Sequence, residues 1–224
     1  MAAAAEHEAA GARLKVTEIF HSIQGEAAFS GWPTVFVRLT GCPLRCQYCD
    51  TAYAFTGGEW RTLAEIEAEV RRYGTRYVCV TGGEPLAQPR CGQLLTALCD
   101  AGFDVSLETS GAIDIAPVDT RVARVLDVKT PGSREAHRNL YDNLALLTPR
   151  DALKFVICDR VDYEWSRALL VERFANGAPC TVFFSPSHEE LAAGDLADWI
   201  LADKLPVRLQ VQLHKVLWGD VRGR

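Results

Sequence analysis

The amino-acid sequence predicts an α/β protein with a mainly parallel sheet, arranged as a partial, open (β/α) barrel. Strand-like and helix-like runs alternate through most of the chain, which is typical of this class. Cysteine and polar residues follow the strands, where parallel sheets place their ligand sites. The 224 residues are fewer than the ~250 of a complete eight-fold barrel. We therefore expect about six parallel core strands and a reduced set of helices.

The first predicted elements rest on side-chain periodicity. Alternating apolar residues predict a strand over residues 14–20, and a β-branched run predicts a second strand over 34–40. Leucine, isoleucine and valine recur at helical spacing over residues 62–73. Thr62 is the expected N-cap of this helix, and Glu65 would complete a capping box.

The middle of the chain repeats the strand–helix pattern. An apolar run predicts a strand over residues 76–81, and three spaced leucines predict a helix over 89–101 that a glycine ends. Further strands are expected over 103–109 and 122–129. Only about ten residues separate these two strands, which is short for a helical crossover.

The remaining elements complete the predicted sheet. Residues 153–158 and 181–185 are expected to be strands, with a helix over 161–174 between them. A last helix is predicted over 188–202 and a last strand over 207–213.

Composition places limits on the class of protein. The net charge of −5 and a pI near 5.6 do not favour a nucleic-acid-binding protein. No stretch approaches ~18 consecutive apolar residues, so no membrane span is expected. The N-terminal residues lack the pattern of a signal peptide, which favours a cytoplasmic protein. We expect a disordered tail over residues 1–12, followed by one domain over 13–224 with N- and C-terminal extensions.

The most informative motif is a run of three cysteines, Cys42, Cys46 and Cys49, with the pattern C-x3-C-x2-C. Three thiolates can hold three irons of a cubane cluster and leave the fourth iron open to a small molecule. Five other cysteines show no paired metal spacing, and we expect them to be buried apolar residues without disulfides. They are Cys79, Cys91, Cys99, Cys158 and Cys180.

The cysteine run, with Tyr48 before its last cysteine and a Gly-Gly-Glu turn after the next strand, resembles the radical S-adenosylmethionine (SAM) superfamily. The resemblance implies a 4Fe-4S cluster whose open iron binds SAM. The cofactor would deliver the radical, so no side chain is assigned a catalytic role. The resemblance assigns ten residues to SAM: Tyr48, Cys49, Asp50, Gly82, Gly83, Glu84, Ser110, Asp127, Lys129 and Ser133. A local salt bridge would equally explain Asp127 and Lys129.

A longer set of motifs is similar to the 7-carboxy-7-deazaguanine synthase family. It comprises F-x-S-I-Q-G-E, R-L-x-G-C, C-D-T, T-G-G-E-P and Q-L-H-K-x-L-W, and it extends from about residue 16 to residue 218. This resemblance implies conversion of 6-carboxy-5,6,7,8-tetrahydropterin to 7-carboxy-7-deazaguanine, on the route to queuosine. Hydrogen would be removed from C6, the ring would contract, ammonia would be lost and SAM would be regenerated.

The same resemblance implies a Mg²⁺ ion held by Thr51, although Thr51 could equally cap a turn. It also implies substrate contacts from Ile23, Gln24, Gly25, Glu26, Arg38, Thr81 and Thr109. A guanidinium at Arg38 suits a substrate carboxylate. Gln212 and His214 match the family's C-terminal motif without an assigned role.

The sequence leaves two alternatives and several partners open. A glycyl-radical activating enzyme shares the cysteine loop, the Gly-Gly-Glu turn and the Asp-x-Lys strand end, but it would need neither a pterin pocket nor Mg²⁺. A non-catalytic zinc or electron-transfer protein is the second alternative. The family resemblance implies a flavodoxin or ferredoxin-type reductant and a homodimer.

Overall fold

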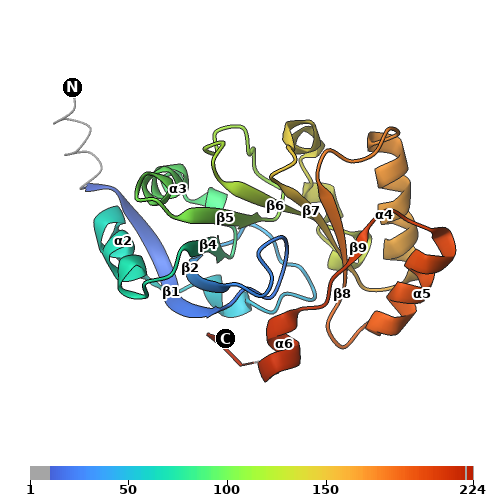
Figure 1. Cartoon of the computed structure of the whole chain (residues 1–224), viewed down its shortest axis with the longest axis horizontal. Helices are drawn as coiled ribbons and strands as arrows, with labels where there is room; N and C mark the ends of the chain where they lie inside the picture. The colour runs from blue at the N-terminus through green and yellow to red at the C-terminus, as the bar shows by residue number, and fades with distance from the viewer. Residues whose placement is uncertain (1–10, 220, 224) are drawn as a thin grey trace.

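The computed structural model describes residues 11–219 and 221–223. In this part of the chain one sheet of nine strands has the order β3-β1-β2-β4-β5-β6-β7-β8-β9 (Figure 1). The strands are β1 (Arg13–Ile23), β2 (Pro33–Leu39), β3 (Glu59–Thr62), β4 (Tyr77–Gly82), β5 (Asp104–Thr109), β6 (Ala123–Val128), β7 (Ala152–Ile157), β8 (Thr181–Pro186) and β9 (Arg208–Leu209). The α-helices are α2 (Leu63–Arg72), α3 (Cys91–Asp100), α4 (Arg160–Arg173), α5 (Ala193–Asp203) and α6 (Leu213–Trp218).

The sheet has a long parallel part and a short antiparallel part. Strands β2, β4, β5, β6, β7 and β8 run parallel to one another, and the two-residue β9 continues this set at one edge. β1 pairs antiparallel with β2 on one side and with β3 on the other, and β3 forms the other edge. The sheet does not close on itself, so the prediction of a partial, open α/β barrel with about six core strands is confirmed.

One face of the parallel strands forms the hydrophobic core. Alternate residues such as Val37 on β2, Leu107 on β5 and Phe155 on β7 are fully buried there. Helices α3, α4 and α5 contact β5, β7 and β8, and α2 contacts β1 and β3. Figure 1 shows α2 and α3 beside the first strands and α4 and α5 beside the last ones. Because side chains alternate along a strand, the opposite face must carry the intervening residues.

The opposite face is the inner face of the open barrel, and each of the six main parallel strands contributes at least one polar residue to it. They are Arg38, Thr81, Glu108, Asp127, Lys154 and Ser185. A small apolar cluster, separate from the main core, lies on the same face: Ala27, Val125, Ala152 and Phe183. The fold therefore separates an apolar layer under the helices from a polar layer that faces inward.

Two predicted elements near the C-terminus were wrong in part. The helix expected over 188–202 begins only at Ala193, because residues 188–190 form a turn in which Glu189 has a φ of 66°. The strand expected over 207–213 has two residues, since the Gln210 side chain bonds the Ala27 backbone and the chain leaves the edge. Helix α6 follows where the sequence had indicated the end of that strand.

The N-terminal side also differs from the prediction. Strand β1 is longer than expected and reaches Ile23, and β3 was not predicted. Most of the expected tail lies outside the described residues. Ala12, however, is buried, and its carbonyl accepts the Leu63 N–H at 3.2 Å, so this residue belongs to the packed domain. No helix in the described residues is long and apolar enough to cross a membrane.

The predicted capping box at the start of α2 is present. The Thr62 hydroxyl accepts the Glu65 N–H at 3.2 Å, and the Glu65 carboxylate accepts the Thr62 N–H at 2.8 Å. Replacing Thr62 by Ala removes the acceptor for one helix N–H, so we expect the free energy of unfolding to fall by about 1 kcal/mol. Urea denaturation would measure the change, with Thr62→Ser as the control that keeps the hydroxyl. Equal losses in both variants would contradict a capping role.

Candidate active site

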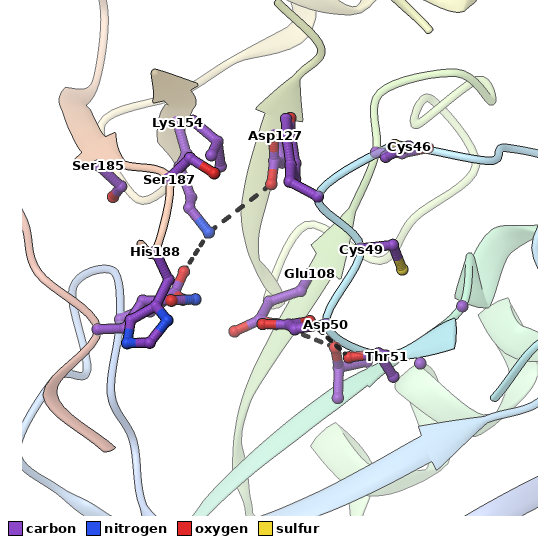
Figure 2. A pocket seen from close by; sticks show the side chains of 18 of the residues that line it. Cys46, Cys49, Asp50, Thr51, Glu108, Asp127, Lys154, Ser185, Ser187 and His188 are labelled. Atoms are coloured by element: carbon purple, nitrogen blue, oxygen red, sulfur yellow. Dashed lines mark hydrogen bonds and ion pairs between the residues drawn. The ribbon is translucent and has the colours of Figure 1, made fainter. Parts of the chain in front are cut away.

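A cavity of about 470 Å³ lies on the inner face of the sheet. The cysteine loop, the carboxyl ends of the parallel strands and the C-terminal segment around α6 all line it. Figure 2 shows that Cys49, Asp50 and Thr51 from the loop lie on one side, with Lys154 and His188 on the other. Seventeen of the twenty predicted site residues, the three cysteines included, line this one cavity.

Of the predicted site residues, Gly25, Glu84 and Ser133 do not line the cavity, and the others do. Each of the three exceptions is engaged inside the protein instead. The ligand contacts themselves stay predictions.

The cysteine loop is held in place by backbone hydrogen bonds to two neighbouring segments. The Gln47 N–H donates to the Ser133 carbonyl at 3.2 Å, and the Arg45 N–H donates to the Glu135 carboxylate at 2.7 Å. Ser133 is buried, and its hydroxyl donates to the Thr130 carbonyl at 2.6 Å. Ser133 therefore supports the loop from behind and does not face the cavity.

The three thiols on this loop suit metal binding on the cavity side. Burial raises the pKa of Cys46 to about 11, and it also raises the pKa of Cys42 and Cys49. The thiols are thus protonated near neutral pH until a metal displaces the protons. A three-thiol loop that opens onto a cavity fits a cluster with one free iron. No group of three or more Cys, His, Asp or Glu in the described residues is arranged to hold a single metal ion, so they offer no preformed four-donor zinc site.

The Gly82-Gly83 turn packs directly against the cysteine loop. A Cβ atom on Gly83 would collide with the Gly41 carbonyl and with the Cys42 side chain, and one on Gly82 would collide with Leu39. The Glu84 N–H then donates to the Gly41 carbonyl at 2.8 Å. Only glycine allows this close approach, so the backbone of the turn borders the cavity.

Glu84 has a structural role that the sequence did not indicate. Its carboxylate is fully buried and accepts hydrogen bonds from the Thr109 hydroxyl at 2.9 Å and from the Ser110 N–H at 2.7 Å. It also accepts the Leu86 N–H at 3.1 Å. Glu84 therefore joins the ends of β4 and β5 and orients two residues that do line the cavity.

Asp127 and Lys129 lie on the same side of β6, as the alternation predicted. Their charged groups are 3.1 Å apart, so the local salt bridge that the sequence left as an alternative is present. Lys129 lies 5.9 Å from the centre of the Tyr48 ring. The Tyr48 hydroxyl is buried without a hydrogen-bond partner among the described residues, and burial raises its pKa. An unpaired buried hydroxyl beside a charged strand end fits a polar ligand such as SAM.

A hydrogen-bonded group of polar residues forms another part of the cavity wall. Glu108 accepts the Thr81 hydroxyl at 2.9 Å and the Gln24 amide at 3.4 Å. Burial raises the pKa of Glu108, and the negative charge of Glu26 raises it further. Glu26 contacts Lys154 and accepts the Gln212 amide at 2.7 Å. These side chains offer both donors and acceptors to a flat polar ligand.

Arg38 lines the cavity but is already paired. Its Nε donates to Glu18 at 2.8 Å, and its guanidinium lies 5.6 Å from the Phe20 ring centre. Glu18 also accepts the Tyr53 hydroxyl at 2.8 Å. A guanidinium has five donors, so the pairing with Glu18 orients Arg38 and leaves other N–H groups for a ligand.

Asp50 and Thr51 end the cysteine loop at the cavity. The Thr51 hydroxyl donates to Asp50 Oδ1 at 2.8 Å, and Lys215 lies 3.5 Å from Asp50 Oδ2. Since the Thr51 hydroxyl uses its hydrogen atom to donate a hydrogen bond to Asp50, the lone pairs on its oxygen remain available to a cation. The Thr51 side chain makes no cap hydrogen bond to the short turn Ala52–Ala54.

The C-terminal segment completes the wall next to Gly25. The Leu213 N–H donates to the Gly25 carbonyl at 3.1 Å, and a Cβ atom on Gly25 would collide with the His214 ring. Gly25 thus makes room for His214, which lines the cavity. Burial lowers the pKa of His214, so this imidazole is mainly neutral at pH 7.

Sequence reasoning missed several residues that line the cavity. They are Phe20, Phe36, Leu44, Phe55, Glu108, Lys154, Val156, Ser185, Pro186, Ser187, His188, Glu189, Glu190 and Lys215, together with the unassigned Gln212 and His214. A signal was present for Glu108 and Lys154, since each is a charged residue inside an otherwise apolar strand. The loop residues after β8 had no comparable signal.

Comparison with known proteins places these features in a family context. Residues 36–128 match the radical SAM superfamily. A protein of Chlorobaculum tepidum named 7-carboxy-7-deazaguanine synthase is 44% identical over 216 residues, which covers 95% of this chain and 98% of the relative. A relative of the same name from Koribacter versatilis is 41% identical over 219 residues, which covers 92% of this chain and 97% of the relative.

A solved structure shows the same fold. The crystal structure of QueE from Escherichia coli has a TM-score of 0.74 with this chain and 24% sequence identity, and it covers 90% of this chain and 95% of that one. The structure of SuiB from Streptococcus suis bound to S-adenosylmethionine has a TM-score of 0.52 and 13% identity, over 77% and 44% of the two chains.

The packing of Gly83 generates a testable prediction. Gly83→Ala should push the turn away from the cysteine loop, lower the free energy of unfolding by about 1–3 kcal/mol and reduce the iron bound after reconstitution. The control is Gly92→Ala on α3, where a Cβ atom meets nothing within 4 Å. Iron analysis and urea denaturation would measure both variants. Normal iron content and normal stability in Gly83→Ala would contradict the close packing.

Proposed function

The chain belongs to the 7-carboxy-7-deazaguanine synthase family of radical SAM enzymes, and we propose on this premise that it converts 6-carboxy-5,6,7,8-tetrahydropterin to 7-carboxy-7-deazaguanine with loss of ammonia. One observation carries the proposal. A single cavity joins a three-thiol loop, a glycine turn that borders it and a wall of hydrogen-bonding side chains from the inner sheet face. The cavity therefore borders both the loop that would hold a cluster and a wall suited to a small polar substrate.

Cys42, Cys46 and Cys49 would hold a 4Fe-4S cluster, and residues at the ends of the parallel strands would bind SAM. When bound, these cofactors supply a carbon-centred radical that can remove hydrogen from a substrate. The protein's part is to bind and orient. The Gly82-Gly83 backbone can approach a ligand closely, and Asp127 and Lys129 offer one charge of each sign at the end of β6.

The wall formed by Gln24, Glu26, Thr81 and Glu108 supports binding of the pterin. A pterin presents adjacent N–H donors and a carbonyl acceptor, and this wall carries carboxylate, amide and hydroxyl groups that match such an edge. Arg38 is held by Glu18 at the cavity, where its remaining N–H groups suit the substrate carboxylate. Phe20, Phe36 and Phe55 also line the cavity and would limit water around a radical.

We further propose a Mg²⁺ ion at Thr51. The orientation of its hydroxyl toward Asp50 supports this, because the lone pairs are left for a cation. One hydroxyl is a weak ligand, so water and the substrate carboxylate would complete the coordination. Asp50, Gly83, Thr109 and Ser110, which also border the cavity, are further proposed ligand contacts.

The reaction needs a one-electron donor, for which we propose a flavodoxin or ferredoxin-type protein in the cytoplasm. We also propose that the enzyme works as a homodimer. The family membership and the hydrogen-bonding wall of the cavity favour this function over a glycyl-radical activating enzyme. The same membership disfavours a zinc or electron-transfer protein.

Turnover by the reconstituted protein tests the function. Anaerobic enzyme with reductant, SAM and 6-carboxy-5,6,7,8-tetrahydropterin should form 7-carboxy-7-deazaguanine and ammonia. SAM should be recovered intact, because the proposed reaction regenerates it. Mass spectrometry would follow both compounds, with the Cys46→Ala variant as the control without a complete cluster. SAM cleavage without formation of the deazapurine would contradict the proposed substrate.

The proposed Mg²⁺ site makes a separate prediction. Thr51→Ala should raise the Mg²⁺ concentration that gives half-maximal activity by about tenfold, because one protein ligand is lost. Thr51→Ser keeps the hydroxyl and should remain close to the wild type. Iron content should stay normal in both variants. An unchanged Mg²⁺ response in Thr51→Ala would remove Thr51 from the metal site.

A further inference from the structure

Lys154, a lysine on the buried strand β7, lies on the cavity floor between two candidate ligand contacts. Its ammonium group contacts the Glu26 carboxylate and lies 3.7 Å from Asp127 Oδ2. Figure 2 shows Lys154 pointing toward Asp127 across the cavity. Asp127 is a proposed contact of SAM and Glu26 a proposed contact of the pterin. Lys154 therefore connects the two halves of the site.

A lysine at this position is costly for the fold. Its neighbours in the strand, Leu153 and Phe155, are fully buried in the core on the other face. Burial lowers the pKa of Lys154, but the carboxylates of Glu26, Asp127 and Glu108 outweigh this effect and hold the pKa above its ordinary value. The side chain therefore stays an ammonium inside the cavity wall. A purely structural strand would place an apolar residue here.

Lys154 also determines the state of Glu26. Burial raises the pKa of Glu26, but the charge of Lys154 and its hydrogen bond outweigh this, so the pKa lies below its ordinary value. The second oxygen of Glu26 accepts the Gln212 amide at 2.7 Å. Glu26 is thus an anion with both oxygens oriented, and it can accept hydrogen bonds but cannot donate them.

We propose that Lys154 is a positioning residue that fixes Glu26 as an ionised acceptor for the N–H donors of the substrate and links it to Asp127 on the cofactor side. The proposal rests on the proposed function, because it takes the substrate to present an N–H edge to Glu26. If Lys154 were only a counter-ion, it would stabilise the fold without acting on substrate binding through Glu26. In a positioning role, Lys154 affects substrate binding through Glu26.

A double-mutant cycle tests this dependence. The variants are Lys154→Met, Glu26→Gln and the double variant, each loaded with cluster and SAM. The dissociation constant for the pterin would be measured by calorimetry without reductant, so that no turnover occurs. Each single variant should weaken binding by about tenfold or more, because each removes the oriented carboxylate acceptor. The double variant should bind no more than about threefold more weakly than Glu26→Gln alone. Independent effects that multiply in the double variant would overturn the proposal.

The pH dependence of binding gives a second readout. In Lys154→Met the pKa of Glu26 should rise, because the charge and hydrogen bond of Lys154 no longer offset the effect of burial. Pterin binding should then improve as the pH rises through that raised pKa, whereas the wild type should show no such rise. Asp50, Glu108 and His214 also act on Glu26 electrostatically, so Glu26→Gln is needed as the reference that lacks its titration. A Lys154→Met variant with the wild-type pH profile would contradict the proposal.

Two control variants and one replacement variant separate the outcomes. Lys204→Met, at an exposed position after α5, should bind pterin as the wild type does. Lys154→Arg keeps the positive charge and should restore most of the affinity. If Lys154→Met does not fold, Lys154→Gln takes its place in the cycle. Absence of pterin binding in the wild type would contradict the proposed function itself, whereas a wild type that binds and an additive cycle contradict only the role of Lys154.

Discussion

The alternation of side chains along six parallel strands is the constraint on which the rest of this structure depends. Every second residue packs under the helices, so the residues between them must face inward. Each strand uses one of these inward positions for a polar group, from Arg38 on β2 to Ser185 on β8. A shift of one residue in any strand would exchange a core residue with a polar one. The core and the site are therefore fixed by the same register.

The inner face carries charges that would be unfavourable one at a time. Glu26, Glu108 and Asp127 surround Lys154, and burial acts against the charged forms of Glu26, Glu108 and Lys154. The structure offsets that cost by pairing and by neutral donors such as Thr81 and Gln212. Groups that are oriented before a ligand arrives need little rearrangement on binding. The same pairing explains why the acids differ, with Glu26 ionised and Glu108 shifted toward the protonated form.

Much of the architecture was predictable because it depends on local patterns. The six parallel strands, the capping box at Thr62 and the position of the cysteine loop after β2 all follow from periodicity and spacing. The edges were harder. β3 and α6 are short, and their conformation depends on contacts with distant segments, such as that of Leu213 with Gly25. The fold class could be predicted because it depends on local patterns in the longer elements. The edges were missed because tertiary contacts outweigh local preference in short elements.

The candidate site was predicted less evenly than the fold. Motif residues such as Cys42 and Gly83 could be recognised because glycine and cysteine have specialised chemistry. The buried role of Glu84 could not be recognised, because its partners Thr109 and Ser110 are on another strand. Lys154 carried a visible signal, a charge within an apolar strand, but its partner Glu26 is 128 positions away in sequence. Spacing within one segment cannot reveal such pairs.

The contact between Gly25 and the segment around His214 has a consequence for biosynthesis. A ribosome adds about 5–20 residues per second, so the 166 residues between Cys49 and Lys215 take roughly 8–33 s to make. During that interval the thiols have been translated while part of their enclosure has not. Assembly of the metal centre on a nascent chain would therefore occur in an open, oxidant-accessible pocket, which favours loading after translation is complete.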